Sequence, residues 1–442
     1  MDCGLWTFHL QGPLPIAVAS SVHEMERMLF FVLLQIIVIL LSARIGGQIA
    51  RKVGQPRVVG EIIVGLLLGP SLFGRLHPSL FDFLFQSTSG SSMNILSQIG
   101  LILLMFQIGL EFDFSHLKEA HNRKAVLLIS AAGILLPFSL GFILGKVSAP
   151  YLAPNIHPFG YTLFMATALS ITAIPILGRI MIEFNLTRTR MGAVAITAAA
   201  INDVIGWILL ALISALTVAE FSSAKFSKTL LLLGVYFAVC WWLAKPILHR
   251  IVETFRVSPQ KLPQNLLAII LAMIFISGLF TYKLGIFAIF GGFMMGILLY
   301  DQSQFVAAWK NKISDFITVF FLPIFFTYTG LRTNVHGLDS LELWSWCAAV
   351  IAVATFGKFV GCFFAARWAG MSRAESSCIG IMMNTRALME LIILNVGYDL
   401  GVIPQNVFTM LVLMAIFSTV ITSPFLRFWL PKMGHVIRPR DA

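Results

Sequence analysis

The chain has 442 residues, of which 58% are hydrophobic and only 12% are charged, and its formal net charge is +11. Soluble globular proteins carry about 25% charged residues, so this chain has too few polar groups to cover a surface that faces water. The composition excludes a cytosolic enzyme, a nucleic-acid-binding domain and a disulfide-stapled secreted module. It predicts an all-α polytopic membrane protein that lies mostly in the lipid bilayer.

Apolar runs of roughly 17–25 residues are candidate membrane helices, and the chain contains thirteen runs of about this kind. In chain order they cover residues 29–43, 58–73, 95–110, 126–145, 159–181, 191–218, 230–247, 266–282, 286–300, 313–331, 343–366, 378–396 and 407–429. The second, ninth and twelfth runs are short, and the fifth and twelfth are interrupted by polar residues.

Loop charges give these spans an orientation, because Lys and Arg collect on the cytoplasmic side of a membrane protein. With the N-terminus outside, 22 of the 31 Lys and Arg fall on the cytoplasmic side and 7 on the outer side. We therefore expect a multi-pass protein of the cell (inner) membrane with a cytoplasmic C-terminus. Residues 1–27 would form an extracytoplasmic segment, residues 28–430 the transmembrane domain, and residues 431–442 a short cytoplasmic tail without a regulatory domain.

The seventh span has six spans before it and six after it. A single linker helix between two sets of six forces the second set to enter the membrane inverted relative to the first. Inverted repeats of this kind are typical of secondary transporters, whose binding sites lie near the bilayer midplane.

Ionisable side chains at membrane depth are costly and are functional candidates by default. Within the spans they are Glu61, Asp203, Lys358, Arg386 and Glu390. Asp203 lies near the centre of the sixth span, directly after Asn202, whose side chain offers a neutral oxygen. A buried carboxylate can hold a proton or a monovalent cation in turn, which is the minimum chemistry of an antiporter. The alternative is that Asp203 serves packing alone, through a hydrogen bond to a neighbouring helix.

Lys358 lies inside the eleventh span, where its ammonium group needs a partner. We expect it to be the charge partner of Asp203. The alternative places Lys358 toward the cytoplasmic end of its span, with lipid headgroups around it.

Polar residues interrupt the fifth and twelfth spans at corresponding places in the two halves. In the fifth span Pro175 lacks an amide donor and frees backbone carbonyls beside the hydroxyls of Ser170 and Thr172. The residues that interrupt the twelfth span are Asn384, Thr385 and Arg386, followed by Glu390. Exposed backbone at membrane depth is tolerated where it lines a cavity or is buried in protein, so the breaks predict a midplane site. Arg386 would either neutralise half-helix C-terminal dipoles or pair with Glu390.

Taken in order, these motifs resemble the monovalent cation:proton antiporter-2 family, which includes plant cation/proton exchangers and bacterial potassium-efflux antiporters. The motifs that carry the resemblance are Gly60-Glu61-Ile62 with Gly69-Pro70, Phe106 to Glu111, Ser170 to Pro175, Asn202-Asp203, and Asn384-Thr385-Arg386 with Met389-Glu390-Leu391. They cover about residues 28 to 430. One departure is Ala387, where the family often has Gly, and another is the short tail in place of a large regulatory domain.

The resemblance implies the sodium/proton-antiporter fold, with two broken helices that cross. A mobile core would hold residues 122–218 and 343–430, and the remaining spans would form the scaffold of a homodimer. Asp203 matches the ion-binding aspartate of the family and would be the ligand of the monovalent metal cation, with Asn202 beside it. Lys358 and Arg386 match the basic residues of the eleventh and twelfth spans. The Asn-Asp pair suggests electroneutral exchange.

The sequence therefore predicts a secondary active antiporter that exchanges K⁺ or Na⁺ for protons by alternating access. Its partners would be these ions, the lipid bilayer, a second copy of the chain and a separate cytoplasmic regulatory subunit, with no cofactor and no nucleic acid. One alternative is a gated potassium channel, although the chain has no TVGYG run. Another is an intramembrane aspartyl enzyme, although the chain has no GxGD motif.

Overall fold

The computed structural model describes residues 16–86, 91–111, 123–184, 186, 189–219, 223–386 and 388–433. Most of the predicted N-terminal segment, most of the predicted tail, and Ala387 lie outside these residues. Regular structure in the described residues is helical, apart from one isolated β-bridge between Ser258 and Lys261. The predicted all-α class is confirmed.

The helices follow the apolar runs of the sequence, because backbone groups in lipid must be hydrogen-bonded within their own segment. In the first half they are α1 (Ile16–Lys52), α2 (Arg57–Leu67), α3 (Phe73–Leu76), α4 (Pro78–Phe81), α5 (Ser91–Leu110), α6 (Arg123–Leu152), α7 (Pro158–Ser170), α8 (Ile174–Glu183) and α9 (Arg190–Val218). The linker between the halves consists of α10 (Ser223–Val239) and α11 (Lys245–Thr254). The π-helical turn Cys240–Ala244 joins these two helices.

The second half begins with α12 (Gln264–Lys283) and α13 (Ala288–Leu299). It continues with α14 (Ser303–Trp309), α15 (Leu322–Arg332), α16 (Leu341–Trp368), α17 (Arg373–Met383), α18 (Leu388–Asp399) and α19 (Gln405–Trp429). Two π-helical turns, Lys310–Ser314 and Ile317–Phe321, lie between α14 and α15.

Each of the thirteen predicted runs coincides with a helix or with a broken helix. In the described residues nine helical segments are long and apolar enough to cross a membrane, or ten if Ser303–Ser314 and Ile317–Gly337, bent by 43°, form one span. The helices α2 and α13 have only 11 and 12 residues, and the break between α7 and α8 divides another run. A multi-pass membrane protein is therefore established, whereas the number of thirteen crossings stays a prediction.

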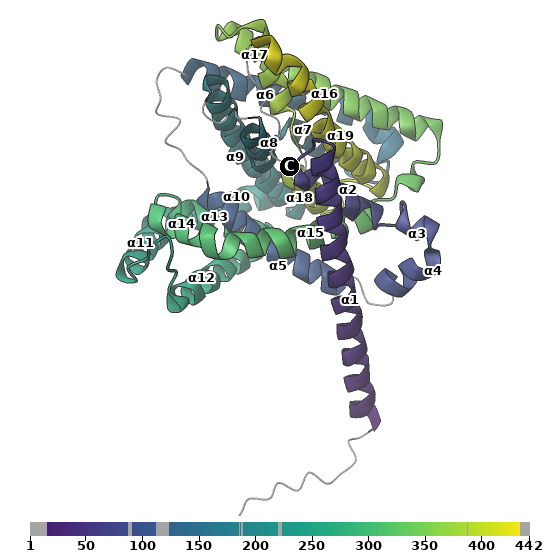
Figure 1. Cartoon of the computed structure of the whole chain (residues 1–442), viewed down its shortest axis with the longest axis vertical. Helices are drawn as coiled ribbons and strands as arrows, with labels where there is room; N and C mark the ends of the chain where they lie inside the picture. Colours follow the sequence, from purple (N-terminus) through teal and green to yellow (C-terminus); the bar gives the residue numbers. More distant parts are fainter. Residues whose placement is uncertain are drawn as a thin grey trace, which may run out of the picture.

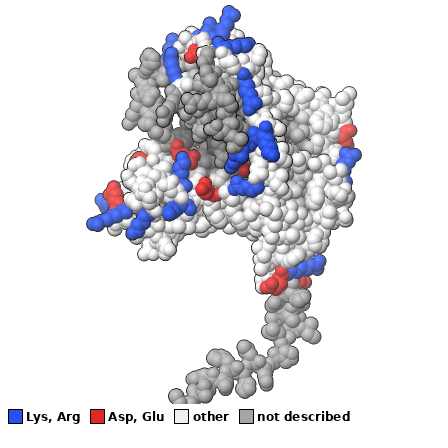
Figure 2. All heavy atoms as spheres, in the orientation of Figure 1, with Lys and Arg blue, Asp and Glu red and all other residues white. Residues whose placement is uncertain are grey.

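The surface agrees with a lipid environment. Large apolar side chains such as Leu41, Leu231 and Phe364 are more than 60% exposed. Figure 2 shows wide areas of the visible face without charged side chains, while Lys, Arg, Asp and Glu gather in separate groups. Apolar side chains that face outward over whole helices are expected where the solvent is a hydrocarbon.

The helices pack in two groups. One contains α6, α7, α9, α16, α17 and α19, in the upper part of Figure 1; the other contains α1, α2, α5, α12, α13 and α15 below it. In the lower group α2 and α15 touch backbone to backbone, since a Cβ atom at Gly330 would collide with the carbonyl of Gly65. That the upper group acts as a mobile core and the lower group as a scaffold stays a prediction.

Candidate functional site

The first break separates α7 from α8 in the upper group. Helix α7 ends at Ser170, and Ile171 has an extended backbone (φ −80°, ψ 152°). Helix α8 begins at Ile174, so that Pro175 lies in its first turn. Proline is tolerated there because the first amides of a helix have no intrahelical partner, whereas it would interrupt a helix that ran through this point.

The second break separates α17 from α18. Helix α17 begins with a capping box between Ser372 and Glu375 and ends at Met383. Asn384 (φ −82°, ψ 0°) forms its C-cap, and α18 begins at Leu388. Both broken spans of the sequence analysis are therefore interrupted near the positions of their polar residues.

Two hydrogen bonds join the breaks to each other. The backbone N–H of Ala173 donates to the carbonyl of Thr385 at 3.0 Å, and Thr172 Oγ1 donates to the carbonyl of Met383 at 3.2 Å. The segments are more than 200 residues apart in the chain, yet each supplies partners for backbone groups that the other leaves without helical bonds. The structure thus brings Thr172 and Thr385 to one crossing.

Arg386 reaches from the second break to the end of the first half-helix. Its Nη1 donates to the carbonyl of Ala168 at 2.8 Å and its Nη2 to that of Leu169 at 2.7 Å. Nη1 also lies 3.1 Å from Glu390 Oε2, and both side chains are 0% exposed. The sequence left open whether Arg386 neutralises a helix end or pairs with Glu390, and the contacts show both.

Lys358, from α16, completes the same helix end. Its Nζ donates to the carbonyl of Ser170 and, at 2.7 Å, to the carbonyl of Gly133 on α6. Ser170 Oγ donates to the carbonyl of Thr167 at 2.8 Å. The last four carbonyls of α7 are therefore all bonded to side chains, and three of them are bonded to cations, which favour the negative end of a helix dipole.

Asp203 and Asn202 come from α9 and are each 1% exposed. Asn202 Nδ2 lies 3.5 Å from Thr172 Oγ1, the hydroxyl that bonds the second break. The hydrogen bonds of Lys358 described above go to backbone carbonyls, and its role as the charge partner of Asp203 stays a prediction.

Sequence reasoning missed the contribution of α19. Thr419 Oγ1 accepts from the backbone N–H of Arg386 at 3.3 Å, and Thr422 Oγ1 lies 3.5 Å from the carbonyl of Ile381. The signal was present, because Ser418, Thr419, Thr422 and Ser423 form a polar stripe with helical spacing in an apolar span. All four are buried.

Glu61, another of the ionisable residues within the predicted spans, is also buried, at 7% exposure in α2. It belongs to the lower group of helices, near Gly47 of α1.

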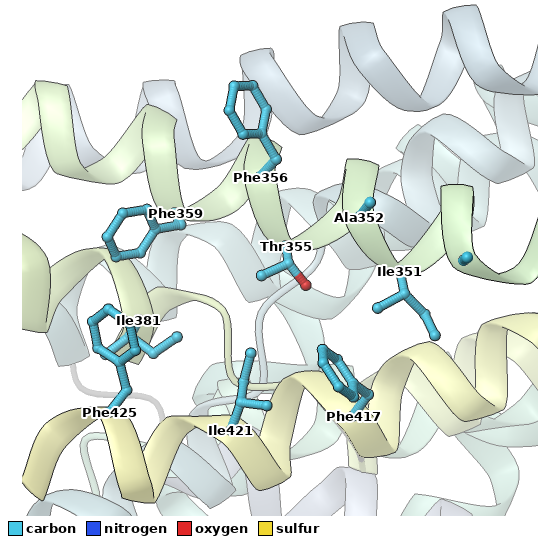
Figure 3. A pocket seen from close by; sticks show the side chains of 10 residues that line it. Ile351, Ala352, Thr355, Phe356, Phe359, Ile381, Phe417, Ile421 and Phe425 are labelled. Atoms are coloured by element: carbon cyan, nitrogen blue, oxygen red, sulfur yellow. The ribbon is translucent and has the colours of Figure 1, made fainter.

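A separate apolar cavity of about 590 Å³ lies between α16 and α19. Its lining includes Phe356, Phe359, Phe417 and Phe425, with Thr355 as its only side chain that bears a polar group (Figure 3). Since no charged residue lines it, this cavity is unsuited to a cation. In the described residues, the buried charged and amide side chains discussed above lie around the crossing instead.

A helical membrane protein in which two broken helices cross beside a buried carboxylate has the architecture of a secondary transporter. Residues 37–432 match the family model for the transmembrane region of sodium/hydrogen exchangers. The chain therefore belongs to the sodium/hydrogen exchanger family, whose members are transporters and not enzymes. This confirms the resemblance drawn from the motifs and removes the aspartyl-enzyme alternative.

Several relatives show the same relationship. The chain is 39% identical to the Na(+)/H(+) antiporter NhaS4 of Synechocystis over 92% of its own length and 99% of that protein. It is 36% identical to cation/H(+) antiporter 17 of Arabidopsis thaliana, over 92% of the chain and 49% of the relative. It is 32% identical to K(+)/H(+) antiporter 1 of Saccharomyces cerevisiae, over 84% of the chain and 43% of the relative. The chain thus spans nearly all of the cyanobacterial protein and about half of the plant and yeast proteins.

The fold also matches a solved structure. The sodium proton antiporter MjNhaP1 from Methanocaldococcus jannaschii superposes with a TM-score of 0.62, covering 92% of this chain and 98% of that one. At 17% sequence identity this likeness concerns the fold. It confirms the predicted sodium/proton-antiporter fold.

Proposed function

We propose that this protein is a secondary active antiporter that exchanges a monovalent cation, Na⁺ or K⁺, for a proton by alternating access. Asp203 takes up the proton and the cation in turn, with Asn202 beside it. The observation that carries the proposal is the burial of Asp203 next to a crossing whose first half-helix is already bonded to Arg386 and Lys358. The relatives named as Na⁺/H⁺ and K⁺/H⁺ antiporters support it.

The buried charges support electroneutral exchange. Asp203, Glu390, Lys358 and Arg386 are all 1% exposed or less, and their formal charges cancel when all four are ionised. A proton or a monovalent cation on Asp203 then adds the same single positive charge. Both loaded forms of the core carry equal charge across the membrane, so a cycle of one cation for one proton moves no net charge.

The proposal also includes the orientation of the protein in the membrane and its oligomeric state. The bias of 22 to 7 basic residues supports an outside N-terminus and a cytoplasmic C-terminus in the cell membrane. The lower group of helices would form the scaffold of a homodimer, and the upper group would move against it. A separate regulatory subunit stays a prediction.

The test uses purified protein in liposomes with an imposed pH gradient. Addition of Na⁺ or K⁺ moves protons through the unmodified protein, whereas Asp203→Asn abolishes this movement because an amide binds no proton in exchange. The matched control is Asp315→Asn, which neutralises an exposed carboxylate far along the chain and leaves the exchange unchanged. Cation-driven proton movement that persists in Asp203→Asn would overturn the role of this residue.

Stoichiometry needs a second measurement. With valinomycin and K⁺ fixing the membrane potential, the rate of Na⁺/H⁺ exchange stays the same at every potential. A rate that rises or falls steadily with potential contradicts one-for-one exchange, because each net charge moved across 100 mV contributes about 2.3 kcal/mol.

A further inference from the structure

Asn384 lies at the centre of the crossing. Both of its chain neighbours bond to the first break: the carbonyl of Met383 accepts from Thr172 at 3.2 Å, and that of Thr385 accepts from the N–H of Ala173 at 3.0 Å. Asn384 itself is 0% exposed. Its side chain is therefore enclosed where the two half-helices meet, without access to bulk water.

The fold does not use the amide group of Asn384. Within the described residues it is the one buried side-chain amide whose oxygen and nitrogen both lack a hydrogen-bond partner. An unbonded buried polar group costs about 1–3 kcal/mol, and native proteins rarely retain one without a reason such as an ion or a water.

Asn395, on the other half of the same broken span, shows what a structural asparagine looks like here. Its Nδ2 donates to Thr329 Oγ1 at 2.8 Å and to the carbonyl of Leu391 at 2.9 Å. Its Oδ1 accepts from Arg332 at 2.9 Å. Hydrogen bonds account for the side chain of Asn395, whereas Asn384 caps α17 through its backbone and its side-chain amide has no hydrogen bond.

A second amide oxygen lies at the same crossing. Asn202 Oδ1 is buried and has no hydrogen-bond partner among the described residues, while its Nδ2 lies 3.5 Å from Thr172 Oγ1. Thr172 therefore stands between Asn202, from the first half, and the Met383–Asn384 corner of the second. Amide oxygens carry two lone pairs, and monovalent cations at membrane depth replace hydration water with oxygens of this kind.

We propose that Asn384 is a ligand of the transported cation and determines which cation is preferred. Its Oδ1 joins Asn202 Oδ1 and the Asp203 carboxylate in replacing part of the hydration shell of the ion. This inference rests on the proposed function, since it requires that the crossing takes up a monovalent cation. The carboxylate provides the negative charge, and the two amide oxygens discriminate between cations of different size. A neutral oxygen binds an ion well only when the oxygen–ion distance suits the radius of that ion.

The test measures the apparent KM of exchange for Li⁺, Na⁺ and K⁺ in liposomes. Asn384→Leu, which removes both polar atoms, raises the KM of the preferred cation by about tenfold or more, the size of effect that one lost ion contact of ordinary strength produces. Asn384→Ser keeps an oxygen on a shorter side chain, and we expect it to alter the ratio of the KM values for Na⁺ and K⁺. The matched control Asn395→Ser lowers the melting temperature and leaves that ratio unchanged.

Binding without transport gives a second readout. A cation that binds the folded protein raises its melting temperature with concentration, and Asn384→Ser shifts the concentration needed for this rise. A wild-type KM ratio together with a wild-type concentration dependence in Asn384→Ser overturns the inference, whether or not Asn384→Leu folds. If Asp203→Asn is inactive at the same time, only the role of Asn384 fails; if Asp203→Asn is active, the proposed function fails as well.

Discussion

The two breaks end their half-helices in different ways. At the end of α7 the carbonyls of Ala168, Leu169 and Ser170 accept hydrogen bonds from the charged groups of Arg386 and Lys358. At the end of α17 the carbonyls of Ile381, Met382 and Met383 accept from hydroxyl and backbone N–H groups, which belong to Asn384, Thr385, Thr422 and Thr172. One helix end is therefore neutralised by fixed cations and the other is bonded to neutral groups.

This difference bears on the cation site that we propose at the crossing. The partial negative charge of a helix C-terminus attracts cations, and at α7 that attraction is already met by Arg386 and Lys358. In the described residues no charged group bonds the end of α17, so its dipole remains available near Asn384. The repeat is thus similar in backbone but asymmetric in charge.

Removal of Arg386 gives the largest expected effect on stability. Arg386→Met leaves Glu390 buried without its ion pair, a change that typically costs 3–5 kcal/mol. We expect the free energy of unfolding in mixed detergent micelles to fall by about this amount. The double variant Arg386→Met with Glu390→Gln recovers part of the loss, because no buried charge is then left alone. If the single and double variants lost the same free energy of unfolding, the unpaired charge of Glu390 would not be the cause of the loss.

Lys358→Met ranks second. It removes the two hydrogen bonds that the ammonium group donates to the carbonyls of Gly133 and Ser170. Unlike Arg386→Met, it does not leave behind a carboxylate that has lost its hydrogen-bonded ion-pair partner. Since a hydrogen bond to a charged group contributes about 1.5–3 kcal/mol, we expect a loss of roughly 3 kcal/mol in the same measurement. Lys312→Met, at an exposed lysine, is the control and changes little. A loss as small as that of the control would mean that α7 needs no cation at its end.

Thr385→Val gives the smallest effect and tests the neutral break. It removes the bond from Thr385 Oγ1 to the carbonyl of Met382, 2.8 Å long, and keeps a β-branched side chain of similar size. The expected loss is about 1 kcal/mol, the usual contribution of one uncharged hydrogen bond. A loss as large as that of Arg386→Met would abolish the distinction between the two breaks.

Much of this architecture could be predicted because its signals are local. Apolar runs define helices wherever the solvent is lipid, and Pro175 and the polar run 384–386 mark the breaks without reference to the rest of the chain. The bonds of Lys358 could not be predicted. Its partners are backbone carbonyls of Gly133 and Ser170, 225 and 188 residues away in the chain, and a carbonyl has no signature in the sequence.

The hydrogen bonding of the Asn384 side chain could not be predicted from the sequence either. The sequence placed it at a break, but whether its amide was bonded depended on every neighbour that the tertiary fold would bring near. Asn395, eleven positions later, has the same side chain and is fully bonded. Residue type and position therefore identified the crossing, whereas the ligand role proposed for Asn384 required the packed structure.

The burial of Asp203 also bears on how tightly the two ion fluxes are coupled. If the core crossed the membrane loaded in one direction and returned empty, each such cycle would carry one charge, and the membrane potential would drive it with about 2.3 kcal/mol per 100 mV. An ionised carboxylate without its ion is costly to hold in a dry site, so the empty return is disfavoured. In the proposed mechanism, the exclusion of water from Asp203 would therefore suppress slippage and keep the transporter from dissipating the gradient that it uses.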